Sequence, residues 1–223
     1  MYIDTHNLLV FFHLALFVYA IGGDIAVYCI GKYVIRDELD LEERLRVRQI
    51  RIMVDMSART CLVLLLPLGF TLALNFGSPL AGMWLALLWA ASIAWLVLVW
   101  IVHAKAGTRL GARLKDVDIA IRYLVAVVML GFGAYCLAAG QPIAQRWLAA
   151  KILLFGGVVL NGIWIRSILT HWPAAIEQAK AGGDTAAKGE AAMKANQAST
   201  NRAALLIWIL VMAMAFLGKL KPF

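Results

Sequence analysis

The chain has 223 residues, of which 63% are hydrophobic and only 15% are charged, and its formal net charge is +8. Because soluble domains carry about a quarter charged residues, this composition excludes a soluble enzyme, a disordered chain and a secreted disulfide scaffold. An excess of Lys and Arg is typical of the cytoplasmic loops of membrane proteins, so no nucleic-acid partner is expected.

The charged residues are gathered between apolar segments, several of which reach the length of about 20 residues that crosses a bilayer as an α-helix. This pattern predicts an all-α, polytopic integral membrane bundle of six transmembrane helices. Residues 1–223 form a single membrane domain in this prediction, with the lipid bilayer as its surroundings. The predicted spans are residues 8–30, 60–75, 84–103, 123–139, 148–169 and 203–218.

Polar residues share one face of the first span. His6, His13 and Asp24 are separated by 7 and 11 residues, which at about 100° per residue places them within about 20° of one another. Such a stripe faces protein or a cofactor, because polar groups are costly in hydrocarbon. His13 is the strongest metal-ligand candidate, with a hydrogen-bonded structural histidine as the alternative. His6 is a weaker ligand candidate and is also consistent with a residue at the membrane interface.

Asp24 follows a pair of glycines and has two interpretations. One is a structural ion pair with Arg59 or Arg122, which enter the membrane near the same depth. The other is a catalytic or proton-relay carboxylate. Lys151 is the second catalytic candidate, and the catalytic residues are otherwise unknown.

Two polar segments interrupt the apolar pattern. Residues 32–59 carry both signs of charge at helical spacing and predict an amphipathic helix that continues into the second span. Residues 173–201 are rich in Ala, Gly, Lys and Gln with few large apolar residues, which predicts a flexible or loosely helical cytoplasmic linker.

The distribution of cations predicts the orientation. Of the 21 Lys and Arg residues, 17 fall in or beside the three connections on one side of the predicted membrane. The positive-inside rule makes that side cytoplasmic, so the N- and C-termini lie outside a bacterial cytoplasmic (inner) membrane. Cys29 and Cys61 fall near the cytoplasmic face and Cys136 near the outer face, so no disulfide is predicted.

A shift of 63 residues aligns residues 55–103 with residues 118–166. The alignment pairs Asp55-x3-Arg59 with Asp118-x3-Arg122, and it predicts an internal duplication of a two-helix hairpin. An Asp and an Arg four residues apart form an ion pair on a helix surface, which predicts one such pair in each copy.

Tryptophans also correspond in the two copies. Trp84 and Trp147 follow a Gly-x-Pro turn and are predicted to anchor the hairpins at the outer interface. Lys151 takes the position of Leu88 and lies one helical turn after Trp147, near the depth of His13. Its side chain can snorkel outward, ligate a metal when neutral, or pair with a propionate or another anionic group.

His103 and His171 end the third and fifth spans on the cytoplasmic side. Their depth keeps them from sharing a metal with His13. They are weak candidates for a second metal site, and each is also consistent with an ordinary residue at a helix end.

Two motifs carry a resemblance to a known family. They are Phe12-His13-Leu-Ala-Leu-Phe-Val-Tyr19-Ala-Ile-Gly22-Gly23 in the first span and Pro142-x4-Trp147-Leu-Ala-Ala-Lys151 at the start of the fifth. Together they resemble the CopD/HemJ-like membrane proteins. The resemblance implies a helical bundle whose HemJ-type members bind haem b and oxidise protoporphyrinogen IX, and whose CopD-type members are associated with copper. By position it implies that His13 is an axial haem ligand and that Lys151 lies beside the cofactor.

Three functional hypotheses follow. The first is a haem b-binding membrane protein with a redox or electron-transfer role, which includes a protoporphyrinogen-oxidase-like oxidoreductase. The second is a copper or small-solute transport protein of CopD type, because neutral imidazole binds copper as well as haem iron. The third is a non-catalytic membrane subunit of a larger complex. Beyond the lipid bilayer, the candidate partners are a membrane redox partner or a second copy of the chain.

Overall fold

The computed structural model describes residues 4–222, and all of its regular structure in that range is helical. Six helical segments are long and apolar enough to cross a membrane, which confirms the prediction of an all-α, multi-pass membrane protein. The helices are α1 (Thr5–Tyr33), α2 (Leu41–Ala73) with the short 3-10 helix η1 (Leu74–Phe76), α3 (Met83–Ala104), α4 (Arg109–Ala139), α5 (Arg146–Leu169), α6 (Trp172–Lys180) and α7 (Gly183–Leu220).

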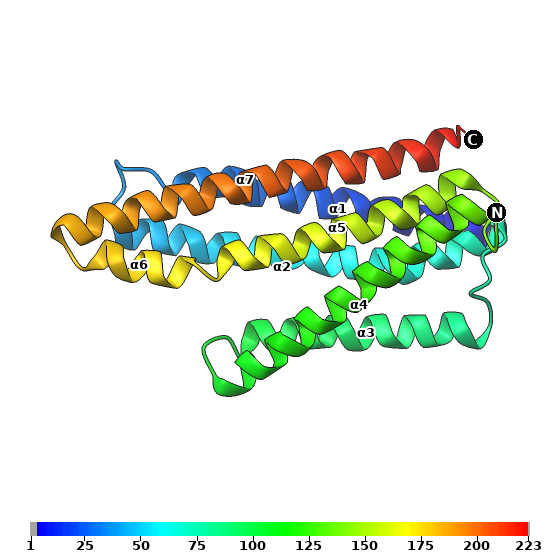
Figure 1. Ribbon diagram of the computed structural model, residues 1–223, viewed down its shortest axis with the longest axis horizontal. Helices are drawn as coiled ribbons and strands as arrows, with labels where there is room; N and C mark the ends of the chain where they lie inside the picture. Colours follow the sequence, from blue (N-terminus) through cyan, green and yellow to red (C-terminus); the bar gives the residue numbers. More distant parts are fainter. Residues whose placement is uncertain (1–3, 223) are drawn as a thin grey trace.

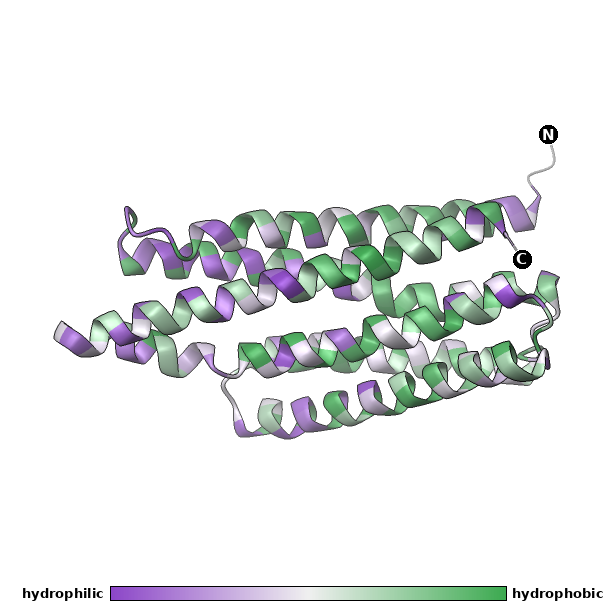
Figure 2. Cartoon of the chain, turned by 45° about the horizontal axis from the view of Figure 1, so that its top comes forward, coloured by the Kyte–Doolittle hydropathy of each residue, from purple (hydrophilic) through white to green (hydrophobic). Residues whose placement is uncertain are grey.

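The start of α1 and the end of α7 lie at the same end of the bundle, here called the termini end (Figure 1). The connections from α1 to α2, from α3 to α4 and from α6 to α7 lie at the opposite end, here called the basic end. Polar residues become frequent toward the basic end, where α2, α6 and α7 extend beyond their apolar stretches (Figure 2).

Aspartate side chains cap the starts of α1 and α2. Asp4 accepts a hydrogen bond from the backbone N–H of His6 at 3.1 Å, and Asp40 accepts one from that of Glu43 at 2.7 Å. Each bond satisfies a donor that the first helical turn leaves unpaired. These caps fix where α1 and α2 begin, and therefore the register in which their polar residues reach the bundle interior.

Most helices pack on their neighbours in the chain, and α7 also packs on α5 and α1. α1 lies along α2, α4 along α5, and both α5 and α6 along α7. α3 packs mainly on α2 and α4 and forms one side of the molecule (Figure 1). The main apolar core lies between α2, α4 and α5 in the half of the bundle nearest the termini.

The segment 173–201 differs from the predicted flexible linker. It forms α6 and the first half of α7, and these helices pack against the loop after α1 and the polar start of α2. Trp172 and Met193 are fully buried there beside Val34. The small residues that suggested mobility instead allow close approach: Gly189 of α7 lies against the backbone of Ala179 in α6.

The two predicted copies share local structure. The ion pairs Asp55–Arg59 and Asp118–Arg122 both form, as predicted. Gly77 and Gly140 both adopt left-handed backbone angles, with φ of 79° and 66°, where glycine is the residue without a steric cost.

Burial separates the two copies. Trp84 is 67% exposed at the start of α3, as an interfacial anchor requires. Trp147 is only 7% exposed and packs edge-on against Phe76 with 5.1 Å between ring centroids. The predicted anchor role of Trp147 is therefore not observed, because α5 lies between α4 and α7 whereas α3 lies at the edge.

Candidate functional site

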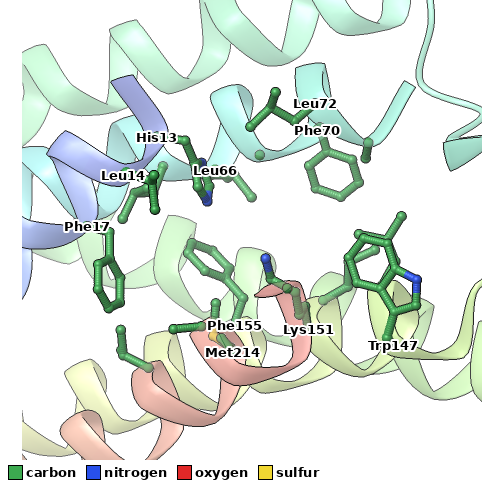
Figure 3. Close-up of a pocket in the computed structure, with 18 of the residues that line it drawn as sticks. His13, Leu14, Phe17, Leu66, Phe70, Leu72, Trp147, Lys151, Phe155 and Met214 are labelled. Carbon is green, nitrogen blue, oxygen red and sulfur yellow. The ribbon is translucent and has the colours of Figure 1, made fainter. Parts of the chain in front are cut away.

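A cavity of about 330 Å³ lies between α1, α2, α5 and α7 in the half of the bundle nearest the termini. Its walls are mostly aliphatic and aromatic side chains, which Figure 3 shows around the open space. Its ionisable lining residues are His6, His13, Lys151, Lys219 and Lys221. An apolar cavity with a few convergent polar groups is the usual form of a cofactor or small-molecule site.

His13 projects into this cavity from α1 (Figure 3). Its Nδ1 atom is buried and has no hydrogen-bond partner among residues 4–222. Gly69 of α2 lies beside the ring, since a Cβ atom at that position would be 3.6 Å from Cε1 of His13. Buried polar atoms in proteins nearly always have a partner, so His13 has the character of a ligand-binding residue.

Lys151 projects into the same cavity from α5, on the wall opposite His13 (Figure 3). The structure thus brings together the two residues that the family resemblance singled out. Gly218 of α7 leaves room for the lysine, because a Cβ atom there would lie 2.6 Å from Nζ of Lys151. The sequence analysis missed both Gly69 and Gly218, since their role depends on which helices become neighbours.

The end of the chain closes one side of the cavity. Nζ of Lys221 lies 4.4 Å from the ring centroid of Phe76 and 5.4 Å from that of Trp147. These are cation–π distances. Lys151 and Lys221 therefore place positive charge along the side of the cavity nearest the termini end.

His6 also lines the cavity. The side-chain amide of Asn75 donates a hydrogen bond to Nδ1 of His6 at 2.7 Å. That bond occupies one of the two imidazole nitrogens and links α1 to η1. With Nδ1 accepting this bond, Nε2 of the neutral ring carries the proton and can donate a hydrogen bond.

The two histidines of the predicted second metal site lie on separate elements. His103 lies on α3 with its ring edge-on to Trp100, and His171 is exposed before α6. Neither residue lines the cavity described above, and no group of three or more metal-ligating side chains occurs within residues 4–222. The reason is the fold: α3 packs on α2 and α4, whereas α6 packs on α7.

A second, smaller cavity of about 80 Å³ lies toward the basic end. Asp24, Asp55, Arg59, Arg122 and Arg166 line it together with apolar side chains. Asp24 reaches it from α1, so the stripe predicted on the first span does face the bundle interior.

The arginines of this second cavity are already paired. Arg59 pairs with Asp55, while Arg122 and Arg166 both pair with Asp118. The carboxylate of Asp118 has no exposed surface and also accepts a 2.9 Å hydrogen bond from Nε1 of Trp95. The predicted ion pair of Asp24 with Arg59 or Arg122 does not form among the described residues.

The fold and the two cavities define a multi-pass membrane helical bundle with an apolar cavity lined by histidine and lysine side chains. In comparisons with known proteins, no protein-family model matches the chain, and no curated protein or solved structure gives a significant match.

Proposed function

We propose that the protein binds haem b in the cavity between α1, α2, α5 and α7 and has a redox or electron-transfer role in the membrane. The observation that carries the proposal is that His13 and Lys151 face one another across this apolar cavity. The two residues belong to separate short sequence motifs and are 138 positions apart in the chain.

The chemistry of the lining fits haem b in three respects. The imidazole of His13 offers a nitrogen ligand, and its buried Nδ1 lacks a partner among residues 4–222. The aliphatic and aromatic walls suit the faces of a porphyrin. The ammonium groups of Lys151, Lys219 and Lys221 provide counter-charges for two carboxylates.

In this proposal His13 binds the iron, and Lys151 holds an anionic group of the cofactor. Bound haem iron supplies one-electron chemistry, whose potential depends on the axial ligand, on hydrogen bonding and on burial. The side chains of Phe17, Phe70 and Phe155 line the cavity and give it apolar walls. The basic end faces the cytoplasm in this proposal, so the cavity lies toward the outer face of a bacterial inner membrane.

The donor set favours haem over a protein-ligated copper ion. Copper sites of the type with two histidines and one cysteine are built from three or more converging ligands. Here one nitrogen of His6 is bound to Asn75, and no group of three or more His, Cys, Asp or Glu side chains that could hold a metal occurs within residues 4–222.

The test is a visible spectrum of the full-length protein purified in mild detergent after expression with haem supplied. Wild type, His13→Ala and His103→Ala are compared in oxidised and dithionite-reduced forms. We expect a Soret band and sharp α and β bands in wild type and in His103→Ala, whose histidine lies outside the cavity. We expect loss of these bands in His13→Ala.

A colourless wild type would overturn the proposal, and copper analysis of the same sample would then test the transport hypothesis. Full haem content in a folded His13→Ala protein would overturn the role of His13. Circular dichroism of the variant checks that its helices are intact. Assays with porphyrinogens, run on the haem-loaded protein, test the oxidase activity that the family resemblance implies.

A further inference from the structure

The cavity toward the basic end contains a carboxylate that the proposed haem site does not use. Two aspartates and three arginines line it, Asp24, Asp55, Arg59, Arg122 and Arg166, and a third aspartate, Asp118, pairs with two of the arginines from outside the lining. Every arginine has an aspartate partner, and every aspartate except Asp24 has an arginine partner among the described residues.

Two opposing influences act on the charge of Asp24. Arg122 and Arg166 share the single charge of Asp118, which leaves one positive charge in excess and favours an ionised Asp24. The carboxylate of Asp55 lines the same small cavity, and the surrounding helices remove water, both of which favour a protonated Asp24. The other elements lining the cavity, α3 and α7, contribute no ionisable group, only Trp95 and Ile207.

The cavity has the polarity and the volume to hold water. Nη2 of Arg122 is buried without a partner among residues 4–222. A volume of about 80 Å³ exceeds the roughly 10–15 Å³ that one water needs. Water in this cavity gives Asp24 a proton donor and acceptor.

The surroundings of Asp24 are polar toward the basic end and apolar toward the termini end. Between Asp24 and the basic end, the side chains of Arg51, Gln197 and Asn201 form a hydrogen-bonded chain, with bonds of 2.8 and 2.7 Å. α1 lies against this chain, because Gly31 leaves room for the amide of Gln197. Toward the termini end, the cavity meets the His13 cavity at three residues that line both: Leu62, Phe155 and Val158.

We propose that Asp24 is a proton-exchange site within the membrane, which gains and loses a proton near neutral pH by exchange with water from the basic end. The step is a simple acid–base transfer: hydronium gives its proton to the carboxylate and leaves water, and the reverse transfer restores the ion. The apolar partition of Leu62, Phe155 and Val158 separates this exchange from the His13 cavity.

The test is infrared spectroscopy of the full-length protein in lipid, titrated through the neutral range, with purification from cells grown without added haem. The C=O stretching band of a protonated carboxyl group is expected to grow as the pH falls in wild type. We expect its loss in Asp24→Asn and its return, at a shifted frequency, in Asp24→Glu.

Asp37→Asn is the matched control, because Asp37 lies in the loop between α1 and α2 and is exposed. A 2.7 Å hydrogen bond from Lys194 holds the pKa of Asp37 below its ordinary value. That carboxylate is ionised near neutral pH and makes no contribution to the band. The control variant is therefore expected to match wild type.

No band in wild type across the neutral range would overturn the proposal, as would a band that persists in Asp24→Asn. The measurement does not depend on haem, so its failure and that of the haem proposal are distinguishable. A colourless protein that shows the band contradicts only the haem proposal. A haem-loaded protein without the band contradicts only the proton-exchange proposal.

Discussion

Gly218 of α7 leaves the space that the Lys151 side chain occupies, since a Cβ atom at position 218 would lie 2.6 Å from Nζ of Lys151. The position of the Lys151 amine in the cavity therefore depends on how α7 packs against α5. Gly218 has no functional group of its own, yet the absence of its side chain sets where the Lys151 amine can lie in the proposed site.

Gly218→Ala is expected to weaken haem binding without unfolding the protein. The new methyl group displaces a flexible amine, which moves at low cost but loses its contact with an anionic group. We expect Kd for haem to rise about tenfold, equivalent to about 1.4 kcal/mol, measured by titration of the apoprotein. In a Lys151→Met background the same substitution is expected to have no further effect.

Gly157→Ala is the matched control for that experiment. A Cβ atom there would meet Leu210 at 3.7 Å, an ordinary contact distance. Its haem affinity should equal that of wild type. Equal affinity of Gly218→Ala and wild type would contradict the role assigned to the Lys151–Gly218 contact.

Gly133→Ala is expected to destabilise the bundle, because Gly133 of α4 lies against the backbone of Leu153 in α5. A Cβ atom at this position would come 2.6 Å from the backbone nitrogen of Leu153, and overpacking of a tight contact costs about 1–3 kcal/mol. The free energy of unfolding in detergent micelles measures the change.

Gly131 provides the comparison, because it lies two residues earlier on α4 and a Cβ atom there would meet none of the described atoms within 4 Å. Gly131→Ala should leave stability unchanged or raise it by up to about 1 kcal/mol through helix propensity. The same stability for both variants would mean that α4 and α5 do not approach one another at Gly133.

Trp95→Phe is expected to lower the free energy of unfolding by about 1–3 kcal/mol, because it removes a hydrogen bond to a buried carboxylate. Nε1 of Trp95 donates to Asp118 at 2.9 Å, and both side chains are buried. Thermal unfolding followed by circular dichroism measures the loss.

Trp100→Phe is its control on the same helix. Nε1 of Trp100 donates to the hydroxyl of Thr60 at 3.2 Å, in an exposed position. Because the bond is exposed and joins two uncharged groups, we expect a loss below about 1 kcal/mol. If Trp100→Phe lowered the free energy of unfolding more than Trp95→Phe, the hydrogen bond from Trp95 to the buried Asp118 would not be the stronger contribution to stability.

Glu190→Gln is expected to loosen the packing of α7 on α2 at the basic end. Its carboxylate accepts two hydrogen bonds from Arg44, at 2.8 and 2.5 Å, and the arginine side chain is only 5% exposed. Because Glu190 is partly exposed, we expect a loss of about 1–3 kcal/mol, less than the roughly 3–5 kcal/mol of a fully buried pair.

Glu42→Gln removes a pair of the same kind from the surface, where Arg46 and Glu42 are both more than 70% exposed. Its effect should stay within about 0.5 kcal/mol. Protease digestion between α6 and α7 gives a second readout, since only Glu190→Gln should expose that connection. Equal protection of both variants would contradict the packed arrangement of residues 173–201.

Much of the architecture follows from the order of apolar and polar residues along the chain. Segments of about 20 apolar residues form membrane-spanning helices wherever they occur, because backbone polar groups in lipid must bond within the segment. The placement of His13 and Asp24 on one face of α1 follows from helical periodicity alone. The ion pairs Asp55–Arg59 and Asp118–Arg122 form for the same reason, since their partners are one helical turn apart.

The tertiary structure decided which of the two similar hairpins, α2–α3 or α4–α5, has its second helix buried in the bundle. Trp84 and Trp147 have equivalent sequence surroundings, yet only Trp147 is buried, because α5 packs on both α4 and α7. It also decided that residues 173–201 form packed helices and that Arg166 joins Asp118 and leaves Asp24 without an arginine among the described residues. Local patterns specify the face that a helix buries, but the partner of each charge depends on which helices become neighbours.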